Sequence, residues 1–369
     1  MSRKSLNTLL SNRDVVTKLA QLGITTSRDL LEANKILLIY HLNLSLRDVD
    51  EVIQEVSSNL FDQRLTSCRE IYSEYLKSQN FMSSSIKSLD DALRGGLPIG
   101  RLTEIVGSAG AGKTQFCLGV CVHAIVDHWK KNAFAVVNTA DGNAPAYSAG
   151  GGVLYYDTEN KFDAIRFKKI AINKFPELFD SQFSTDAVHR LEILCSKVTI
   201  RKVFTTKELN DDIDSKETKD FIVERGITLI VIDSIAYLFR NESGDEHSKE
   251  ANLVAPAANL KKIADRMGAV VLITNQISQI DYDSSNNNKY GDTFQQNSSE
   301  LRPFLGSTWS HCITSRLVMR SGMVNFKPTE EKYIDIAKSP LAPNMILAYK
   351  ITDAGISCDL NEMLPNQTK

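Results

Sequence analysis

The feature that most constrains the fold of this chain is the stretch at residues 107–114, which reads GSAGAGKT. An apolar run, residues 102–106, precedes it, and a helical pattern over residues 115–126 follows it. The spacing is that of a P-loop, in which glycines let backbone N–H groups approach phosphate oxygens and the next helix directs its positive end toward them. A glycine-rich turn could match this spacing by chance, but a strand before it and a helix after it favour nucleotide binding.

The P-loop spacing assigns roles to individual residues. We expect the three glycines to take positive φ. Lys113 should lie against the β- and γ-phosphates of a nucleoside triphosphate, and Thr114 should ligate Mg²⁺ through its hydroxyl. The residues expected to surround the nucleotide are Gly107, Ser108, Ala109, Gly110, Ala111, Gly112, Lys113, Thr114 and Gln115.

Composition is that of an ordinary globular chain. Its 369 residues, 42% hydrophobic and 24% charged, suffice for one large domain and a small one. A formal net charge of −2 provides no overall basic field, so any nucleic-acid contact must be local or supplied by a partner. The six cysteines form no CxxC pair, which indicates reduced thiols inside a cell. We expect no signal peptide, because the first ten residues lack a long enough apolar region, and no membrane span, because no apolar run reaches roughly 18 residues.

Apolar and polar patterns divide the chain into segments. Residues 1–60 carry apolar sets at helical spacing. A turn at Asn43 resembles a degenerate helix-hairpin-helix, in which a glycine would bring the backbone to a DNA phosphate, so a packing or protein-contact role is favoured over DNA binding. The predicted segments are a helical domain (1–60), a polar, serine-rich linker (61–85), a large domain (86–358) with an insertion (127–151), and a C-terminal tail (359–369).

Strands and helices alternate through the large domain. Residues 227–233 and 269–274 are continuous apolar, β-branched runs, as expected of parallel strands covered on both faces. Shorter runs near the C-terminus indicate an antiparallel extension. We therefore predict an α/β fold whose mostly parallel central sheet is covered by helices on both faces. The predicted strands are 153–157, 198–203, 227–233, 269–274, 313–319, 332–337 and 345–351, and the predicted helices are 115–126, 162–175, 210–225 and 253–267.

Polar side chains at strand ends complete the expected site. Asp233 follows four apolar residues and is typical of a carboxylate that holds Mg²⁺. Ser234 stands where many ATPases place a catalytic Glu, so Glu159 is the candidate that polarises the attacking water, the alternative being a Glu in the first turn of a helix. Asn275 and Gln276 end a central strand, where an amide could sense the γ-phosphate or simply cap the strand.

Six stretches resemble the core of the RecA-type recombinases: GSAGAGKTQ, LYYDTE, LIVIDS, LITNQI, LGSTWSHCITSRL and IAKSPLAP, in this order. The similarity runs from about residue 15 to residue 357 and is greatest to the eukaryotic Rad51 paralogues, the B type in particular. The resemblance implies a RecA-like P-loop ATPase, with ATP and Mg²⁺ as cofactors, whose hydrolysis depends on DNA and is weak. It further implies a nuclear role in homologous recombination and double-strand-break repair.

The resemblance also implies partners and residue roles. The partners are other recombinase paralogues, a C-type paralogue first among them, and single-stranded and branched DNA. Lys113 and Thr114 would hold phosphate and Mg²⁺, and Asp233 would hold Mg²⁺. Glu159 would be the catalytic base, Gln276 would sense the γ-phosphate, and Arg166 would stack on adenine.

Three departures from the family pattern qualify these roles. The filament-forming members carry a Phe-x-x-Ala strand in the linker, whereas Leu65 and Cys68 stand here, which favours docking to another subunit over self-polymerisation. Lys338 replaces an Asp and would face the nucleotide of a neighbouring subunit. The two expected DNA-facing loops, residues 240–250 and 279–304, each carry two basic and four acidic residues. Their basic residues are Arg240, Lys249, Lys289 and Arg302.

Two hypotheses from different classes remain. One is a DNA-binding ATPase subunit of a recombination complex; the other is a scaffold in which ATP holds subunits together and which needs no DNA of its own. The acidic loops favour the scaffold, and the complete set of phosphate-site residues favours the ATPase. A metabolic P-loop kinase is disfavoured because it would have no use for Gln276.

Overall fold

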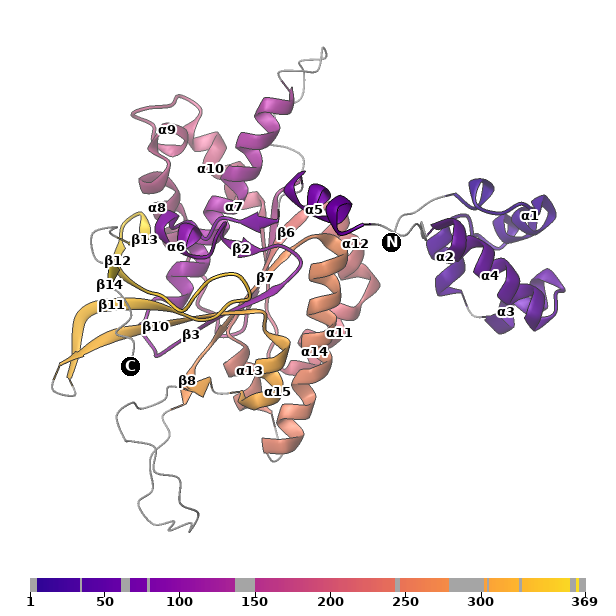
Figure 1. Ribbon diagram of the computed structural model, residues 1–369. Helices are drawn as coiled ribbons and strands as arrows, with labels where there is room; N and C mark the ends of the chain where they lie inside the picture. Colours follow the sequence, from indigo (N-terminus) through magenta and orange to yellow (C-terminus); the bar gives the residue numbers. More distant parts are fainter. Residues whose placement is uncertain are drawn as a thin grey trace, which may run out of the picture. The chain divides into compact units, whose positions relative to one another are not determined.

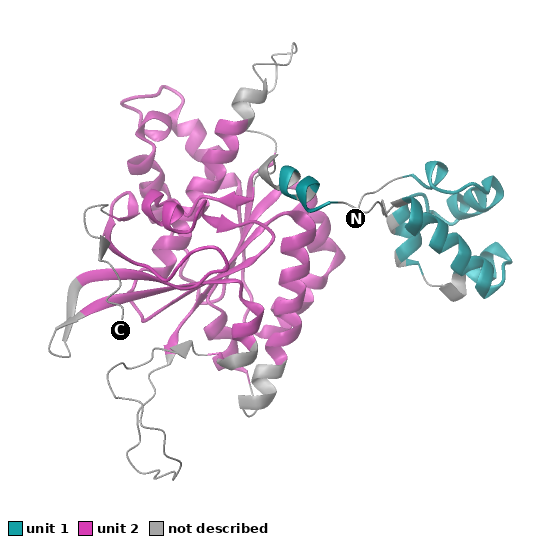
Figure 2. Ribbon diagram, viewed as in Figure 1, with its two compact units in different colours: residues 1–78 teal, residues 79–369 magenta. Residues whose placement is uncertain are grey.

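A computed structural model describes most of the chain. The described residues are 5–33, 35–60, 67–77, 80–136, 150–242, 246–278, 302–303, 305–324, 327–358 and 363–364. They fall into two compact units, Met1–Ser78 and Gln79–Lys369 (Figure 2). The boundary lies inside the segment expected to be a linker.

The N-terminal unit is helical and has its own apolar core. Asn12 and Thr26 accept hydrogen bonds from the first backbone N–H groups of α1 and α2, which fixes where these helices begin. Asn43 lies between α3 and α4 with φ of 55°, so asparagine adopts the left-handed conformation that glycine would take there. Its elements are η1 (Leu6–Thr8), α1 (Arg13–Gln21), α2 (Ser27–Glu32), α3 (Lys35–Leu42), α4 (Leu46–Leu60) and α5 (Cys68–Lys77).

Helix α5 was not expected, because its residues were assigned to the linker. Ser67 Oγ accepts from the backbone N–H of Glu70, and the Glu70 carboxylate accepts from the backbone N–H of Ser67 at 2.8 Å. This reciprocal capping box is a strong helix-start signal that the sequence did contain. Cys68 is exposed and is the first residue of the helix, whereas the filament-forming members carry a strand at the matching position; docking through Cys68 stays a prediction. Leu65 lies outside the described residues.

The large unit is built on a ten-stranded sheet in the order β13-β12-β11-β10-β3-β7-β6-β4-β5, with β14 paired to β12 (Figure 1). The strands from β10 to β5 in this order are parallel, and β11, β12, β13 and β14 continue the sheet as antiparallel neighbours. The predicted fold class is confirmed. The strands are β3 (Leu102–Gly107), β4 (Gly152–Asp157), β5 (Val198–Arg201), β6 (Ile227–Asp233), β7 (Val270–Asn275), β10 (Ser315–Val324), β11 (Lys327–Lys338), β12 (Ile346–Thr352), β13 (Gly355–Ser357) and β14 (Met363–Leu364).

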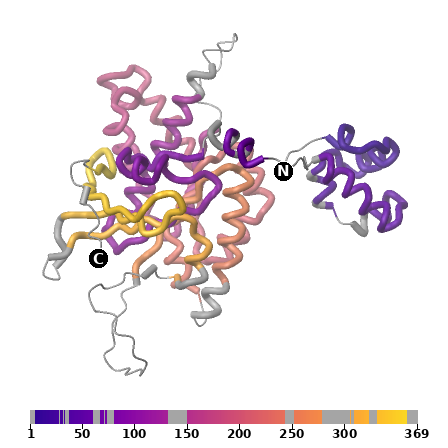
Figure 3. Tube along the Cα trace, in the orientation of Figure 1, coloured from indigo at the N-terminus to yellow at the C-terminus, as the bar shows by residue number. Residues whose placement is uncertain are grey.

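Strand β10 brings late sequence next to the P-loop strand. It pairs in parallel with β3, from Ser315 opposite Thr103 to Met319 opposite Gly107. The trace in Figure 3 shows the yellow-orange strand β10 lying beside the purple strand β3. Strand β14 falls within the segment expected to be a C-terminal tail. Two short strand pairs accompany the sheet: β1 (Phe81–Met82) with β2 (Leu97–Pro98), and β8 (Ile277–Ser278) with β9 (Arg302–Pro303).

Helices cover both faces of the sheet, because alternate strand residues point to opposite sides. Val153 and Tyr155 of β4 enter one apolar cluster, whereas Leu154 and Tyr156 enter the other. The first face packs against α6 (Lys87–Ala92), α7 (Lys113–Val136), α8 (Ala164–Lys174), α9 (Pro176–Phe179) and α10 (Ala187–Ser196). The second packs against α11 (Thr206–Asp214), α12 (Lys216–Glu224), α13 (Ile235–Asn241), α14 (Glu246–Met267) and α15 (Gly306–Cys312).

Several helix boundaries differ from the prediction. Helix α7 continues ten residues past Val126 into the expected insertion; its added turns bury Trp129, whose ring lies 6.1 Å from that of Phe179. The predicted helix 210–225 is two helices, because Ser215 ends α11 and accepts from the backbone N–H of Thr218 to start α12. Among the described residues, no helix combines the length and apolar character that crossing a bilayer requires.

Candidate phosphate and metal site

The P-loop connects the buried strand β3 to helix α7, and its glycines serve two different purposes. Gly110 and Gly112 have φ of 77° and 101°, as expected. Gly107 does not have positive φ, which corrects the prediction. It ends β3, and an added Cβ would lie 2.6 Å from the carbonyl oxygen of Met319 on the neighbouring strand β10. Gly107 is therefore needed for close strand packing, and the other two for backbone conformation.

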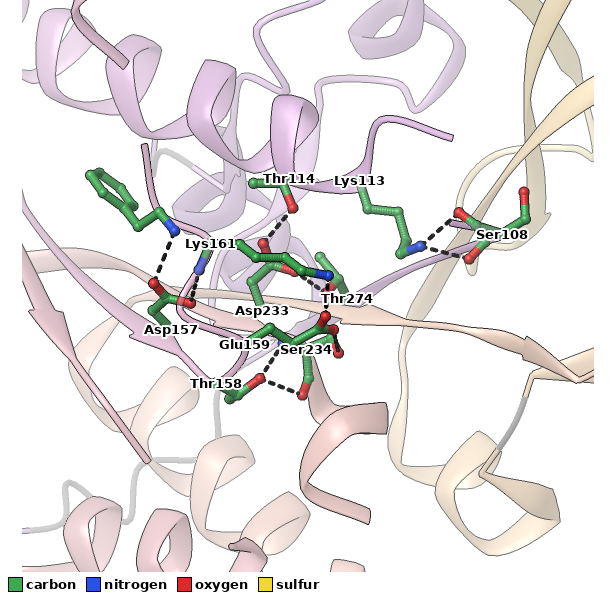
Figure 4. Close-up of polar contacts among 12 residues, drawn as sticks. Ser108, Lys113, Thr114, Asp157, Thr158, Glu159, Lys161, Asp233, Ser234 and Thr274 are labelled. Atoms are coloured by element: carbon green, nitrogen blue, oxygen red, sulfur yellow. Dashed lines mark hydrogen bonds and ion pairs between the residues drawn. The ribbon is translucent and has the colours of Figure 1, made fainter. Parts of the chain in front are cut away.

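Lys113 stands at the first position of α7 and is folded back over the loop. Its ammonium donates to the carbonyl oxygens of Gly107 at 2.7 Å and Ser108 at 2.9 Å (Figure 4). Burial lowers the pKa of Lys113, and the charges of Asp233 and Glu159 partly oppose this. Carbonyl groups do not neutralise the ammonium charge, so Lys113 can still attract an anion such as phosphate. Its half-buried position strengthens the attraction between the two charges.

Asp233, at the end of β6, is the buried acid of the site, with 8% of its surface exposed. Three hydroxyl groups donate to its carboxylate: Thr114 at 2.7 Å, Tyr155 at 2.8 Å and Thr274 at 2.6 Å. No ion pair reaches Asp233 from the residues that the structure describes. The hydroxyl groups orient the carboxylate without neutralising it, so its negative charge remains available to a cation.

The donor set beside the P-loop fits Mg²⁺. Thr114 and Asp233 offer a hydroxyl and a carboxylate oxygen 2.7 Å apart, and both are the hard oxygen ligands that Mg²⁺ prefers. The described residues contain no cluster of three His, Cys, Asp or Glu side chains that would bind a metal alone. This also fits, since Mg²⁺ in nucleotide sites is completed by phosphate oxygens and water.

Glu159 lies two residues beyond β4, at the same edge of the sheet, because β4 and β6 pair with Asp157 opposite Asp233. One oxygen of its carboxylate accepts from the hydroxyl of Ser234 at 2.7 Å, and the other forms an ion pair with Lys161. Burial raises the pKa of Glu159, but the hydrogen bonds from Lys161 and Ser234 outweigh it and hold the pKa below its ordinary value.

Gln276 follows β7, which lies beside the P-loop strand with Asn275 opposite Val106. The Asn275 side chain is buried; its amide donates to Glu104 at 2.7 Å, and its oxygen accepts from the backbone N–H of Gln276 at 2.7 Å. Gln276 is thus held through Asn275 at the edge of the sheet that carries the P-loop.

Arg166, in α8, joins three elements near the loop. Its guanidinium donates to the side chain of Gln115 at 2.6 Å and to the backbone oxygens of Thr352 at 2.6 Å and Asp353 at 3.1 Å. These contacts connect α8 to the start of α7 and to the turn between β12 and β13. They place Arg166 beside the first turn of the P-loop helix.

The remaining predicted residues that the structure describes come from other elements, although the charge of Arg240 acts on Glu159 and helps to lower its pKa. Lys338, at the end of β11, donates to the carbonyl oxygens of Ser310 at 2.9 Å and Ile313 at 2.6 Å, and so caps the end of α15 within its own chain. Arg240 is exposed near the end of α13, and Lys249 lies in α14, so helices occupy most of the first expected loop. Arg302 lies in β9 and Lys289 lies outside the described residues.

Sequence reasoning missed the residues that support the predicted site residues. Tyr155 and Thr274 read as strand core, although each lies near a strand end beside Asp233. Glu104 was also missed; this fully buried acid in β3 accepts from Arg316 at 2.5 Å, Trp309 at 2.7 Å and Asn275. An acid between apolar residues of a central strand was the available signal, because a buried charge requires partners.

The chain is a P-loop nucleotide-binding protein with a RecA-like core. This class is defined by the sheet order, by the P-loop after β3 and by the acid Asp233 at the end of β6, two strands away. The chain belongs to the Rad51 family, a family of RecA-like ATPases: the Rad51 domain matches residues 78–359. The expected family is therefore confirmed.

The chain is also similar over nearly its whole length to proteins named "DNA repair protein RAD51 homolog 2". It is 30% identical to the one from Homo sapiens over 377 residues, covering 96% of this chain and 89% of that protein. The corresponding protein of Mus musculus is 31% identical, with 96% and 98% covered. That of Arabidopsis thaliana is 26% identical, with 95% and 90% covered. These relatives support the resemblance to recombinase paralogues of the B type.

Proposed function

We propose that this protein is an ATP-hydrolysing subunit of a recombinase-paralogue complex that acts in homologous recombination and double-strand-break repair in the nucleus. The observation that carries the proposal is the convergence of four side chains at one edge of the sheet. Lys113 and Thr114 come from the P-loop helix, Asp233 from β6 and Glu159 from the segment after β4. The repair role is supported by the relatives, which are named DNA repair proteins.

In this proposal each residue has a separate task. Backbone N–H groups of the P-loop and the start of α7 bind the phosphates, and Lys113 leaves its carbonyl partners to bind the β- and γ-phosphates. Thr114 and Asp233 hold Mg²⁺, which neutralises phosphate charge. Glu159 accepts a proton from the attacking water while Gln276 contacts the γ-phosphate, and Arg166 stacks on adenine.

DNA binding is the weaker part of the proposal. The relevant ligand is single-stranded or branched DNA, and the candidate contacts are Arg240, Lys249, Lys289 and Arg302. The net charge of −2 and the acidic surroundings of these residues allow few phosphate contacts, so affinity should be low and sensitive to salt.

A scaffold function is the second candidate, and the ion pair between Lys161 and Glu159 favours it because it engages the base before water can. The partner would be another recombinase paralogue, a C-type one first. Leu65 and Cys68 would dock on it. Lys338, which is half-buried at the end of β11, would approach a neighbour's nucleotide after leaving Ser310 and Ile313.

ATP turnover by the purified chain, with and without single-stranded DNA, tests the proposed function. Lys113→Ala should lose ATP binding or turnover while retaining its fold. Glu159→Gln should bind ATP within about threefold of the parent and lose roughly a hundredfold in turnover, because only proton acceptance is removed. Unchanged hydrolysis in both variants would reject the site, whereas ATP binding without turnover in the parent would favour the scaffold.

A further inference from the structure

The side chain that the proposed chemistry leaves without a task is Lys161. It is 64% exposed, yet its ammonium forms an ion pair with Glu159, whose side chain is 14% exposed. Figure 4 shows Lys161 extending from the turn after β4 across the site to the Glu159 carboxylate. Its charge also acts on Lys113 and lowers the pKa of that lysine. A second ammonium group therefore lies inside the phosphate site, directed at the base.

The turn that carries Lys161 is firmly held. The two oxygens of the Asp157 carboxylate accept from the backbone N–H groups of Lys161 and Phe162, each at 2.9 Å. The ring of Phe162 packs edge-on against that of Tyr155 at 5.0 Å. Asn160 takes the left-handed conformation, with φ of 55°, that reverses the chain between Glu159 and Lys161. This backbone fixes the origin of the lysine side chain two residues from the base.

Both oxygens of the Glu159 carboxylate are consequently engaged. Ser234 donates to one, and Lys161 pairs with the other. A base must have a lone pair free toward the attacking water, and a carboxylate that is bonded to an ammonium is a poorer proton acceptor. A neutral hydroxyl donor such as Ser234 orients the carboxylate at far smaller cost to its basicity.

We propose that Lys161 is a brake on ATP hydrolysis, which acts by holding the Glu159 carboxylate in an ion pair that must open before the base can accept a proton from water. The proposal rests on the proposed function, since Glu159 must be the base. In the hydrolytic step the water oxygen bonds to the γ-phosphorus, the bond to the β–γ bridging oxygen breaks, and the water proton passes to Glu159. Lys161 takes no part in bond making and acts only through the base.

The main test compares turnover in charge-removing variants. Lys161→Gln should raise kcat about threefold to fivefold, as expected when an exposed ion pair is lost, with KM for ATP unchanged. Lys161→Arg keeps a cation that can pair with Glu159 and should hydrolyse ATP as slowly as the parent. Lys168→Gln removes another exposed lysine, in α8, and should leave turnover unchanged. A gain in kcat is an effect that a merely structural role would not produce.

A second readout does not depend on activity. Modification of Lys161 by an amine-reactive reagent, followed by peptide mass spectrometry, should be slow in the parent and severalfold faster in Glu159→Gln, with Lys168 as the internal reference. Equal reactivity of Lys161 in both proteins would overturn the ion pair.

The outcomes separate this inference from the proposed function. If Glu159→Gln abolishes turnover but Lys161→Gln does not accelerate it, the brake is wrong and the site stands. If Lys161→Gln lowers turnover and raises KM, Lys161 binds phosphate and the brake is again wrong. If Glu159→Gln hydrolyses ATP as the parent does, the proposed base is wrong and the brake falls with it. Absence of turnover from both the parent and Lys161→Gln also contradicts the brake.

Discussion

Two buried carboxylates, Asp233 in β6 and Glu104 in β3, lie in the same sheet with only β7 between their strands, and they are satisfied in opposite ways. Glu104 bonds to a guanidinium, an indole and an amide. Asp233 bonds to three hydroxyl groups. Glu104 forms an ion pair within the fold, whereas Asp233 is oriented by hydroxyl groups and has no ion pair among the described residues. The contrast separates an acid that holds the structure together from one that we propose receives a cation.

The largest expected effect is on Glu104. Glu104→Gln retains the size of the side chain but leaves the guanidinium of Arg316, 9% exposed, without its counter-ion. We expect the free energy of unfolding to fall by about 3 kcal/mol or more, measured by urea denaturation, because a buried charge is left unpaired. A loss below about 1 kcal/mol would show that Arg316 can reach water.

Thr103→Val is the matched control on the same strand. Thr103 is fully buried and its hydroxyl has no hydrogen-bond partner among the described residues, so the nearly isosteric valine removes only an unsatisfied polar group. Its free energy of unfolding should equal or exceed that of the parent. Equal losses in the two variants would mean that any change in this strand is destabilising, and the assignment to the ion pair would fail.

The partly buried cation Lys174 allows a test on the pH dependence of stability. Burial lowers the pKa of Lys174 to about 8, and its ammonium donates to the backbone oxygen of Ser85 at 2.6 Å. The unfolded chain binds this proton more tightly, so the free energy of unfolding should rise as pH increases from about 8 to 10.5. We expect a rise on the order of 2 kcal/mol relative to Lys174→Met, measured by urea denaturation at each pH. Parallel stability curves for the two proteins would contradict the shift.

The contrast between the two carboxylates also explains how far sequence reasoning reaches. The motif at residues 107–114 and Asp233 were predictable, because phosphate binding depends on local spacing that a single stretch contains. The hydroxyl groups around Asp233 were not, since Tyr155 and Thr274 meet it only through the pairing of three strands. Glu104 was missed for the same reason: its partners lie about 170 to 210 residues away in the chain.

Local signals that compete explain the other errors. Residues 67–77 were assigned to a linker because residues 61–85 are polar and serine-rich, yet the reciprocal capping of Ser67 and Glu70 starts a helix. Gly107 was expected to need positive φ, but tertiary packing against Met319 is what requires a glycine. The local pattern predicted a linker in the first case and a positive φ in the second, whereas specific contacts determined the structure.

Asp233→Asn should have the smallest effect on stability. The substitution keeps a polar group of the same shape among hydroxyl groups that can rotate, and it removes a buried charge that has no ion pair among the described residues. In the absence of nucleotide and metal, we expect the free energy of unfolding to change by less than about 1 kcal/mol in urea denaturation. A loss as large as that of Glu104→Gln would make Asp233 a structural acid as well.

The affinity for ATP with Mg²⁺, divided by that with EDTA, tests most directly whether Asp233 is arranged to receive the metal. Equilibrium titration with a fluorescent ATP analogue gives this ratio for the parent, Asp233→Asn and Glu104→Gln at a temperature where all three are folded. We predict that Asp233→Asn lowers the ratio roughly tenfold or more, while Glu104→Gln leaves it at the parent value. An affinity ratio in Asp233→Asn equal to that of the parent, or an equal fall of the ratio in Glu104→Gln, would contradict the account.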